Sequence, residues 1–188
     1  NYYHQMAFQK VFFLKKIKKK FKYEKIKGLS TEQAFKKLGI KKNLKEFVEL
    51  KRLIYRENLK KIKLYSNSKK TINFLKRKRK KIFIVSGSSR KNILFFLKKN
   101  NITCNGIISK ENTKYSKPNP APYKICLKKF KINNKETVVI EDAFSGIKSA
   151  KDNKLTVIGL NNNRIKKKFE KYFNNFSSFY SFINKIIW

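Results

Sequence analysis

Apolar residues recur at helical spacing through the first third of the chain. In residues 1–26 they stand among lysines, at Phe8, Val11, Phe12, Ile17 and Phe21, and such a stripe is typical of amphipathic helices. A second, longer stripe runs from Leu44 to Leu59. These patterns predict an all-helical domain over residues 1–66, with residues 65–68 as a hinge to the rest of the chain.

The remainder of the chain alternates between short apolar runs and helical patterns. The apolar runs cover residues 81–85, 106–108, 138–140 and 155–160, and such short runs are consistent with buried strands. The tail that ends at Trp188 reads as a final helix with an aromatic face. Strands that alternate with helices indicate an α/β, doubly wound parallel-sheet domain over residues 67–188.

Two adjacent carboxylates, Glu141 and Asp142, directly follow the third apolar run. They stand out because the chain has 49 Lys and Arg residues but only 11 Asp and Glu residues. In an open parallel sheet, ligands bind at the carboxyl ends of the strands, where paired carboxylates suit a hard cation such as Mg²⁺. The alternative is that Asp142 only caps the helix that follows.

A serine-rich loop follows the first apolar run and precedes a helical pattern. It consists of Ser86, Gly87, Ser88, Ser89 and Arg90. Backbone N–H groups and hydroxyls at the start of a helix can bind a phosphate, so this loop is a candidate anion site. An ordinary strand-to-helix turn with a serine cap is the alternative.

Lys117 lies in the segment 116–123, which holds all three prolines of the chain. Proline restricts the backbone and favours the first turn of a helix. Lys117 is therefore expected on a rigid loop before a helix. A solvated surface charge is the alternative, because lysine is abundant in this chain.

The order of these features changes their interpretation. A strand followed by Ser86, then Lys117-Pro118, then a strand followed by Glu141-Asp142 resembles motifs two, three and four of the haloacid dehalogenase (HAD) superfamily. Residues 27–35 look like the cap segment, and residues 2–8 like the first cap helix, of the branch that contains β-phosphoglucomutase and phosphoglycolate phosphatase. The resemblance implies a Rossmann-like core over residues 67–188 with an inserted all-helical cap over residues 1–66.

The resemblance also implies an activity, a Mg²⁺-dependent phosphatase that acts on small phosphorylated metabolites through an aspartyl-phosphate intermediate. Asp142 would ligate Mg²⁺, with Glu141 as a second ligand or as its partner. Ser86 would hydrogen-bond a phosphoryl oxygen with help from loop residues 87–90. Lys117 would neutralise the developing charge.

Three residues of the helical domain are implied as substrate contacts: His4, Thr31 and Arg52. Thr31 stands where the mutase branch carries an arginine that grips a second phosphate, and threonine cannot make that bidentate contact. This favours a phosphatase and leaves a sugar phosphomutase as the alternative. Lys51 or Arg52 would supply a further cation, and His4 lies near the cleft or is an ordinary cap-helix residue.

The first motif of the superfamily, Asp-x-Asp-Gly-Thr on a central strand, has no match in the 188 residues. The chain is therefore expected to be a fragment, or the product of a decayed gene, without the first, central strand and without the nucleophilic aspartate. As given, it is expected to be inactive.

The formal net charge of +38 raises a different hypothesis, a basic protein that binds nucleic acid. Its densest part, the tract 76–81, looks like a nucleic-acid or targeting tract. The basic residues, however, occur in every segment together with abundant Asn, Ile, Phe and Tyr, as in proteins from AT-rich genomes. We therefore expect no specific nucleic-acid partner and interpret the tract as a solvated turn.

Cys104 and Cys126 lack the spacing of a disulfide framework or a metal site and are expected to be buried thiols. No apolar run is long enough to span a membrane, and no signal peptide is recognisable. These features predict a cytoplasmic protein without a membrane partner, and we expect a monomer.

Overall fold

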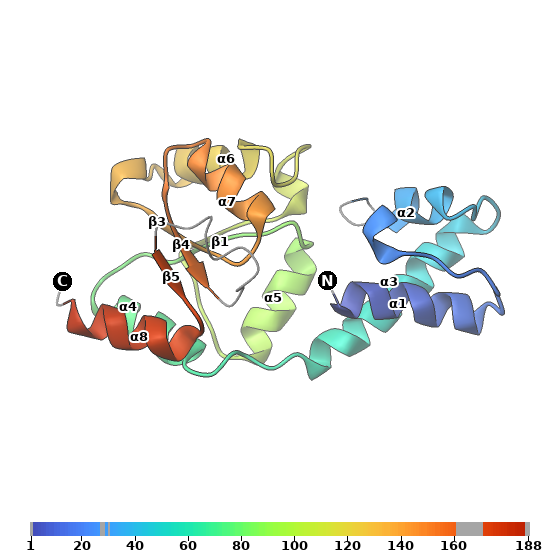
Figure 1. The fold of residues 1–188 in the computed structure, drawn as a ribbon, viewed down its shortest axis with the longest axis horizontal. Helices are drawn as coiled ribbons and strands as arrows, with labels where there is room; N and C mark the ends of the chain where they lie inside the picture. The colour runs from blue at the N-terminus through green and yellow to red at the C-terminus, as the bar shows by residue number, and fades with distance from the viewer. Residues whose placement is uncertain (1, 27–28, 30, 161–170, 187–188) are drawn as a thin grey trace. The chain divides into compact units, whose positions relative to one another are not determined.

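The computed structural model describes residues 2–26, 29, 31–160 and 171–186. The chain divides into two compact units, Asn1–Lys63 and Leu64–Trp188, which we call the N-terminal and C-terminal units (Figure 1). Among the described residues, no helix combines the length and the apolar character needed to cross a membrane.

The N-terminal unit packs three helices around an aromatic core. The helices are α1 (Tyr2–Leu14), α2 (Thr31–Lys37) and α3 (Leu44–Lys61), with the 3₁₀ turn η1 (Tyr23–Lys25). Both α1 and α2 pack on α3. At the centre, the rings of Phe8 and Phe35 meet edge to face with their centroids 4.8 Å apart.

The first helix is shorter than the apolar spacing predicts. It ends at Leu14, and Lys16 adopts a left-handed backbone with a φ of 52°, so the chain leaves the helix before Ile17 and Phe21. Both side chains still pack against the aromatic core. A turn therefore continues the apolar stripe that the sequence pattern assigned to a helix.

The C-terminal unit alternates parallel strands with helices, as the sequence predicts. Its strands are β1 (Phe83–Val85), β2 (Gly106–Ile108), β3 (Val138–Glu141), β4 (Thr156–Leu160) and β5 (Lys171–Phe173). Its helices are α4 (Ser68–Arg77), α5 (Arg90–Lys99), α6 (Ala121–Phe130), α7 (Phe144–Lys151) and α8 (Phe176–Lys185), with the 3₁₀ turns η2 (Lys110–Asn112) and η3 (Asn134–Glu136).

The strands form two parallel sheets. One pairs β1 with β2, and the other has the order β3-β4-β5. No strand within the described ranges joins the two sheets by hydrogen bonds. The fold is α/β with parallel strands, as predicted.

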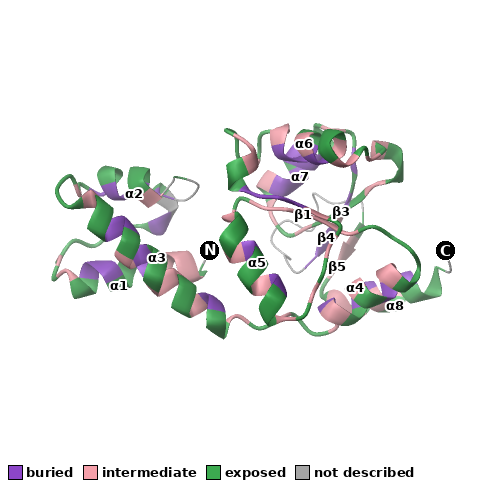
Figure 2. Cartoon of the chain, turned by 180° about the vertical axis from the view of Figure 1, so that it is seen from behind, coloured by how far each residue is buried: buried purple, intermediate pink, exposed green. Residues whose placement is uncertain are grey.

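Helices cover both sides of these sheets. On one side, α6 contacts β1 and β2, α7 contacts β3 and β4, and the two helices pack on each other (Figure 1). On the other side, Leu97 of α5 packs against Ile107 of β2, and Phe74 of α4 and Phe179 of α8 pack against Leu160 of β4. Figure 2 shows the buried residues along the helix faces that meet the strands. Coverage on both sides explains why the strands read as continuous apolar runs.

Strand β3 is the exception to this coverage. Val139 is buried, but Val138 and Ile140 on the opposite face are 47% and 38% exposed. Apolar β-branched residues on a strand of an α/β unit are usually buried, so the exposure of these two is unexpected. One face of β3 therefore lacks the packing that the other strands receive.

Three expectations from the sequence need correction. The tail does not form one helix, because the strand β5 precedes α8. A three-residue run is too short for periodicity to separate strand from helix. Pairing with β4 is what makes these residues a strand. The sequence pattern counted Ser68 with the hinge, but α4 begins at Ser68. Cys126 is buried as expected, whereas Cys104 is only half-buried. Trp188 lies outside the described residues.

Candidate active site

Four of the predicted site residues lie at the carboxyl ends of β1 and β3. Ser86 directly follows β1, Glu141 is the last residue of β3, and Asp142 follows it. Lys117 comes from the loop before α6, and its peptide bond to Pro118 is cis. The tertiary structure brings this lysine to the ends of both strands.

The ammonium group of Lys117 is the centre of the arrangement. Its Nζ donates to the carbonyl oxygen of Val85 and to the hydroxyl of Tyr123, each at 3.0 Å, and forms an ion pair with Oε1 of Glu141. The Tyr123 hydroxyl donates to the same Oε1 at 2.8 Å. An ammonium group has three N–H donors, so these three acceptors engage all of them.

This hydrogen-bond network is largely shielded from water. The side chains of Lys117 and Glu141 are 18% and 10% exposed, and Tyr123 is buried. Burial, together with the neighbouring Glu141 charge, raises the pKa of Tyr123 far above its ordinary value, so the phenol stays neutral. Charge-assisted hydrogen bonds are strong in such surroundings, and here they join Lys117, Tyr123 and Glu141 in one network.

Tyr123 and Gly146 belong to this arrangement, although no motif in the sequence assigned them to it. A Cβ atom on Gly146 would lie only 2.1–2.3 Å from the carboxylate atoms of Glu141, so the glycine makes room for that carboxylate. The available signals were a tyrosine at a buried helical position, which needs a hydrogen-bond partner, and a glycine inside a helix.

Asp142 lies next to the network and is accessible to solvent. The atoms packed around its carboxyl and the adjacent Glu141 charge raise the pKa of Asp142, and the Lys117 charge opposes them. A bound cation would favour the ionised form, and the exposed carboxylate at the end of β3 is an oxygen donor of the kind that Mg²⁺ takes. The charge of Glu141 is already balanced by Lys117. Within the described residues, no group of three or more His, Cys, Asp or Glu side chains is placed to hold a metal.

The serine-rich loop after β1 is closed by its own hydrogen bonds. The N–H of Ser88 donates to Oγ of Ser86 at 3.1 Å. The hydroxyl oxygen of Ser89 caps α5 by accepting a backbone N–H at 3.4 Å, and the N–H of Arg90 donates to a glutamate of η2 at 3.0 Å. Gly87 is exposed, with open space at its Cα. Ser86, whose hydroxyl can still donate, and Gly87 are the groups best placed to meet an anion.

In the N-terminal unit, His4 meets Lys51. The His4 ring stacks on Tyr55 with centroids 4.0 Å apart, and its Nδ1 lies 2.8 Å from Nζ of Lys51. Lys51 is only 3% exposed, and its ammonium lies 4.9 Å from the centroid of the Tyr55 ring. The sequence left open whether Lys51 or Arg52 is the relevant cation, and the structure places Lys51 beside His4.

Arg52 and Thr31 lie on other parts of the N-terminal unit. Arg52 is exposed on α3 and lines a cavity of about 1160 Å³ together with Glu32 and Glu49. A hydrogen bond from Lys36 lowers the pKa of Glu32, and the charge of Arg52 adds to this effect. Thr31 is the first residue of α2.

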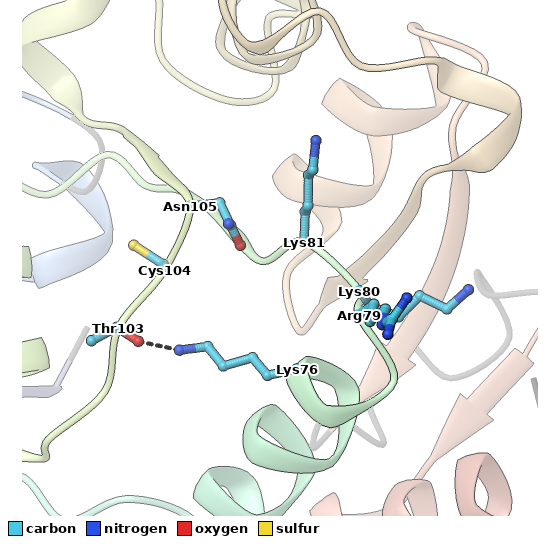
Figure 3. A pocket seen from close by; sticks show the side chains of 7 residues that line it. All are labelled: Lys76, Arg79, Lys80, Lys81, Thr103, Cys104 and Asn105. Atoms are coloured by element: carbon cyan, nitrogen blue, oxygen red, sulfur yellow. Dashed lines mark hydrogen bonds between the residues drawn. The ribbon is translucent and has the colours of Figure 1, made fainter.

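The basic tract 76–81 covers the last two residues of α4 and the exposed turn that leads to β1, where a solvated turn was expected. Four of its cations line a cavity of about 350 Å³ with Thr103, Cys104 and Asn105 (Figure 3). Lys76 hydrogen-bonds the Thr103 hydroxyl, while Lys81 points in a different direction (Figure 3). The ammonium groups of these two lysines therefore do not converge on one point.

Solved structures of similar fold cover nearly the whole chain. A β-phosphoglucomutase from Clostridium difficile is 22% identical, with a TM-score of 0.79, over 98% of this chain and 89% of that one. A hydrolase from Pseudomonas syringae is 18% identical, with a TM-score of 0.78, over 100% and 93%. CbbY from Rhodobacter sphaeroides is 15% identical, with a TM-score of 0.76, over 93% and 88%. At these identities, the similarity establishes the fold.

The sequence itself carries the family relationship. No curated protein matches it. The sequence profile described as haloacid dehalogenase-like hydrolase matches residues 3–160, a range that includes Ser86, Lys117, Glu141 and Asp142. Because the match spans most of the 188 residues, the chain belongs to the family of haloacid dehalogenase-like hydrolases.

Proposed function

We propose that this chain provides the phosphate-handling part of a Mg²⁺-dependent phosphatase for small phosphorylated metabolites. The observation that carries the proposal is the meeting of Lys117 and Glu141 at the carboxyl ends of β1 and β3, beside Ser86 and Asp142. Membership of the hydrolase family supports the reaction class. The proposed setting is the cytoplasm, without a membrane or a specific nucleic-acid partner.

Each residue has a distinct task in the proposed reaction. Ser86 donates its hydroxyl, and Gly87 its N–H, to oxygens of the phosphoryl group. Lys117 places positive charge where the transferred group develops negative charge. Asp142 would hold Mg²⁺, which when bound neutralises phosphate charge. Glu141 is assigned to fixing Lys117, because its Oε1 is already bound by that ammonium.

The nucleophile has to come from outside these residues. The 188 residues contain only two aspartates, Asp142 and Asp152. Asp152 lies at the end of α7 and pairs with Lys148 at 2.9 Å, in keeping with a structural role. A reaction through an aspartyl-phosphate therefore needs a further aspartate. We propose that residues 1–188 alone do not hydrolyse phosphate esters.

The proposed substrate class follows from the relatives and from Thr31. Structures of CbbY contain phosphate or xylulose-(1,5)bisphosphate, and that protein is similar in fold to this chain. Thr31 cannot form a bidentate contact with a second phosphate. A monophosphate ester is therefore preferred over the bisphosphate chemistry of a mutase.

The test uses the reading frame that contains residues 1–188 together with any residues encoded in frame before Asn1. We expect this protein to hydrolyse p-nitrophenyl phosphate only with Mg²⁺. The Asp142→Asn variant should lose the activity, whereas the matched Asp152→Asn variant should keep it. Full turnover by Asp142→Asn would rule out the assignment.

A second assay separates the phosphatase from a sugar phosphomutase. The phosphatase should release inorganic phosphate from a panel of monophosphate esters without any activator. Interconversion of hexose phosphates that depends on a sugar bisphosphate would instead identify a mutase.

A further inference from the structure

The loop that carries Lys117 belongs to no helix or strand. It connects η2 to α6, and residues 113–120 have turns and irregular backbone. Loops of this kind are usually more mobile than the elements they join. The position of the Lys117 ammonium therefore depends on the contacts that tie this loop to the rest of the C-terminal unit.

Two polar side chains at the end of α7 hold carbonyl groups of this loop. The hydroxyl of Ser149 donates to the carbonyl oxygen of Asn119 at 2.6 Å. Nδ2 of Asn153 donates to the carbonyl oxygen of Pro120 at 2.9 Å and to that of Ser149 at 2.8 Å. The two loop carbonyls lie two and three residues after Lys117, so the loop is fastened to α7 close to that lysine.

The Ser149 hydroxyl is a buried group that points out of its own helix. The residue is 0% exposed, and a buried hydroxyl needs a hydrogen-bond partner. A serine inside a helix can bond a carbonyl of the preceding turn. This hydroxyl has one hydrogen, and it donates that hydrogen to the Asn119 carbonyl. The contact therefore joins α7 to the loop.

The same helix also makes room for the partner of Lys117. Gly146 leaves the space that the Glu141 carboxylate occupies, and it lies three positions before Ser149, so the two residues share a face of α7. Helix α7 packs on α6, which follows the loop (Figure 1). One helix therefore contacts the segments that supply both members of the ion pair between Lys117 and Glu141.

We propose that Ser149 and Asn153 are positioning residues for Lys117. By holding two carbonyls of its loop, they keep the ammonium at the carboxyl ends of β1 and β3. Neither side chain needs to touch the substrate. The consequence for catalysis rests on the function proposed above, in which Lys117 faces the transferred phosphoryl group, whereas the positioning itself does not.

The first test measures how fast the Lys117 amine is acetylated by N-acetoxysuccinimide in the chain of 188 residues. Its N–H donors are engaged and its side chain is 18% exposed, so it should be among the slowest lysines. In Ser149→Ala the loop should leave its position part of the time, and Lys117 should react about two- to tenfold faster. Mass spectrometry after digestion gives the rate for each lysine.

Ser68→Ala is the matched control. Ser68 of α4 is 4% exposed, and its hydroxyl donates to the Tyr65 carbonyl at 2.7 Å. The same substitution there removes the same kind of hydrogen bond away from the Lys117 loop. The melting temperature should fall as in Ser149→Ala, while acetylation of Lys117 should change by less than about twofold. If Ser149→Ala does not fold, Asn153→Ala decides, because Asn153 is only half-buried.

The longer reading frame shows whether the position of Lys117 matters for turnover. With p-nitrophenyl phosphate, we expect Ser149→Ala to lower kcat about two- to tenfold. KM should stay within about twofold, because Lys117 acts on charge that develops during the reaction. Ser68→Ala should leave both constants unchanged.

The proposal would be overturned if Lys117 were acetylated equally fast in the unaltered chain and in folded Ser149→Ala or Asn153→Ala. An equal rise in Ser68→Ala would also overturn it, since general loss of stability would then explain the effect. Acetylation requires no turnover. An inactive longer reading frame would therefore refute the phosphatase, while the acetylation rates would still decide the positioning role.

Discussion

At the scale of single residues, Gly146 has the clearest consequence. It lies inside α7, where alanine would normally stabilise a helix by up to about 1 kcal/mol. Here, a Cβ would overlap the Glu141 carboxylate at 2.1–2.3 Å and break its contacts with Lys117 and Tyr123. We expect Gly146→Ala to lower the free energy of unfolding by about 1–3 kcal/mol.

Chemical denaturation measures this effect, and Gly87→Ala is the matched control. A Cβ on Gly87 meets no atom within 4 Å, so that variant should change the free energy of unfolding by less than about 0.5 kcal/mol. If Gly146→Ala were neutral or stabilising, Glu141 would not be held where the structure places it.

The two thiols are expected to differ in reactivity. Burial raises the pKa of Cys126 to about 11, and because the thiolate is the reactive form, it should react slowly with a disulfide reagent at pH 8. Its rate should rise with pH until the pH approaches that value. Cys104 is half-buried and should react first.

Ellman's reagent counts these thiols. One equivalent should react rapidly in the native chain and a second only after unfolding, and Cys104→Ser should remove the rapid one. Rapid reaction of Cys126 in Cys104→Ser at pH 8 would contradict the buried position of α6.

At the scale of secondary-structure elements, the end of α4 contains a non-glycine residue in a left-handed backbone conformation, which lowers the stability of the chain. Arg79 adopts a left-handed backbone with a φ of 57°, and bonds from Arg79 N to Lys76 O and from Lys80 N to Leu75 O close the helix end. Glycine is preferred at this position. We expect Arg79→Gly to raise the free energy of unfolding by about 0.5–1 kcal/mol.

The control is Lys78→Gly, one residue earlier, where φ is −82°. Glycine has no conformational advantage there, so Lys78→Gly should lower the free energy of unfolding by about 0.5–1 kcal/mol. Thermal melts of the two variants against the parent chain distinguish them. Equal effects of the same sign would mean that loss of charge, and not backbone conformation, is being measured.

At the scale of the whole molecule, the net charge of +38 predicts weak association with any polyanion. Because the basic residues are spread along the chain, we expect similar affinities for unrelated duplexes. The logarithm of the binding constant should fall by about 0.9 per neutralised phosphate for each tenfold rise in salt. Filter binding at 50–300 mM KCl measures this. A salt-resistant complex with one defined sequence would instead indicate a selected nucleic-acid partner.

Much of the fold could be predicted from the sequence because it depends on local pattern. Apolar spacing indicated α3, and apolar runs indicated β1 to β4. The strand β5 was missed, since its three residues become a strand only by pairing with β4. The end of α1 was also missed, because Ile17 and Phe21 reach the core from a turn. Periodicity records which residues are buried and not how the backbone brings them there.

The sequence by itself determined the candidate groups of the site: Ser86, Lys117, Glu141 and Asp142, each next to a strand or a rigid loop. Only the tertiary structure decided which of them touch. The three acceptors of Lys117 come from β1, α6 and β3, which are far apart in sequence, and contacts of this kind depend on how the strands and helices pack. For the same reason Tyr123 and Gly146 became part of the site, because their roles arise from burial and from the space beside Glu141 and not from their local pattern.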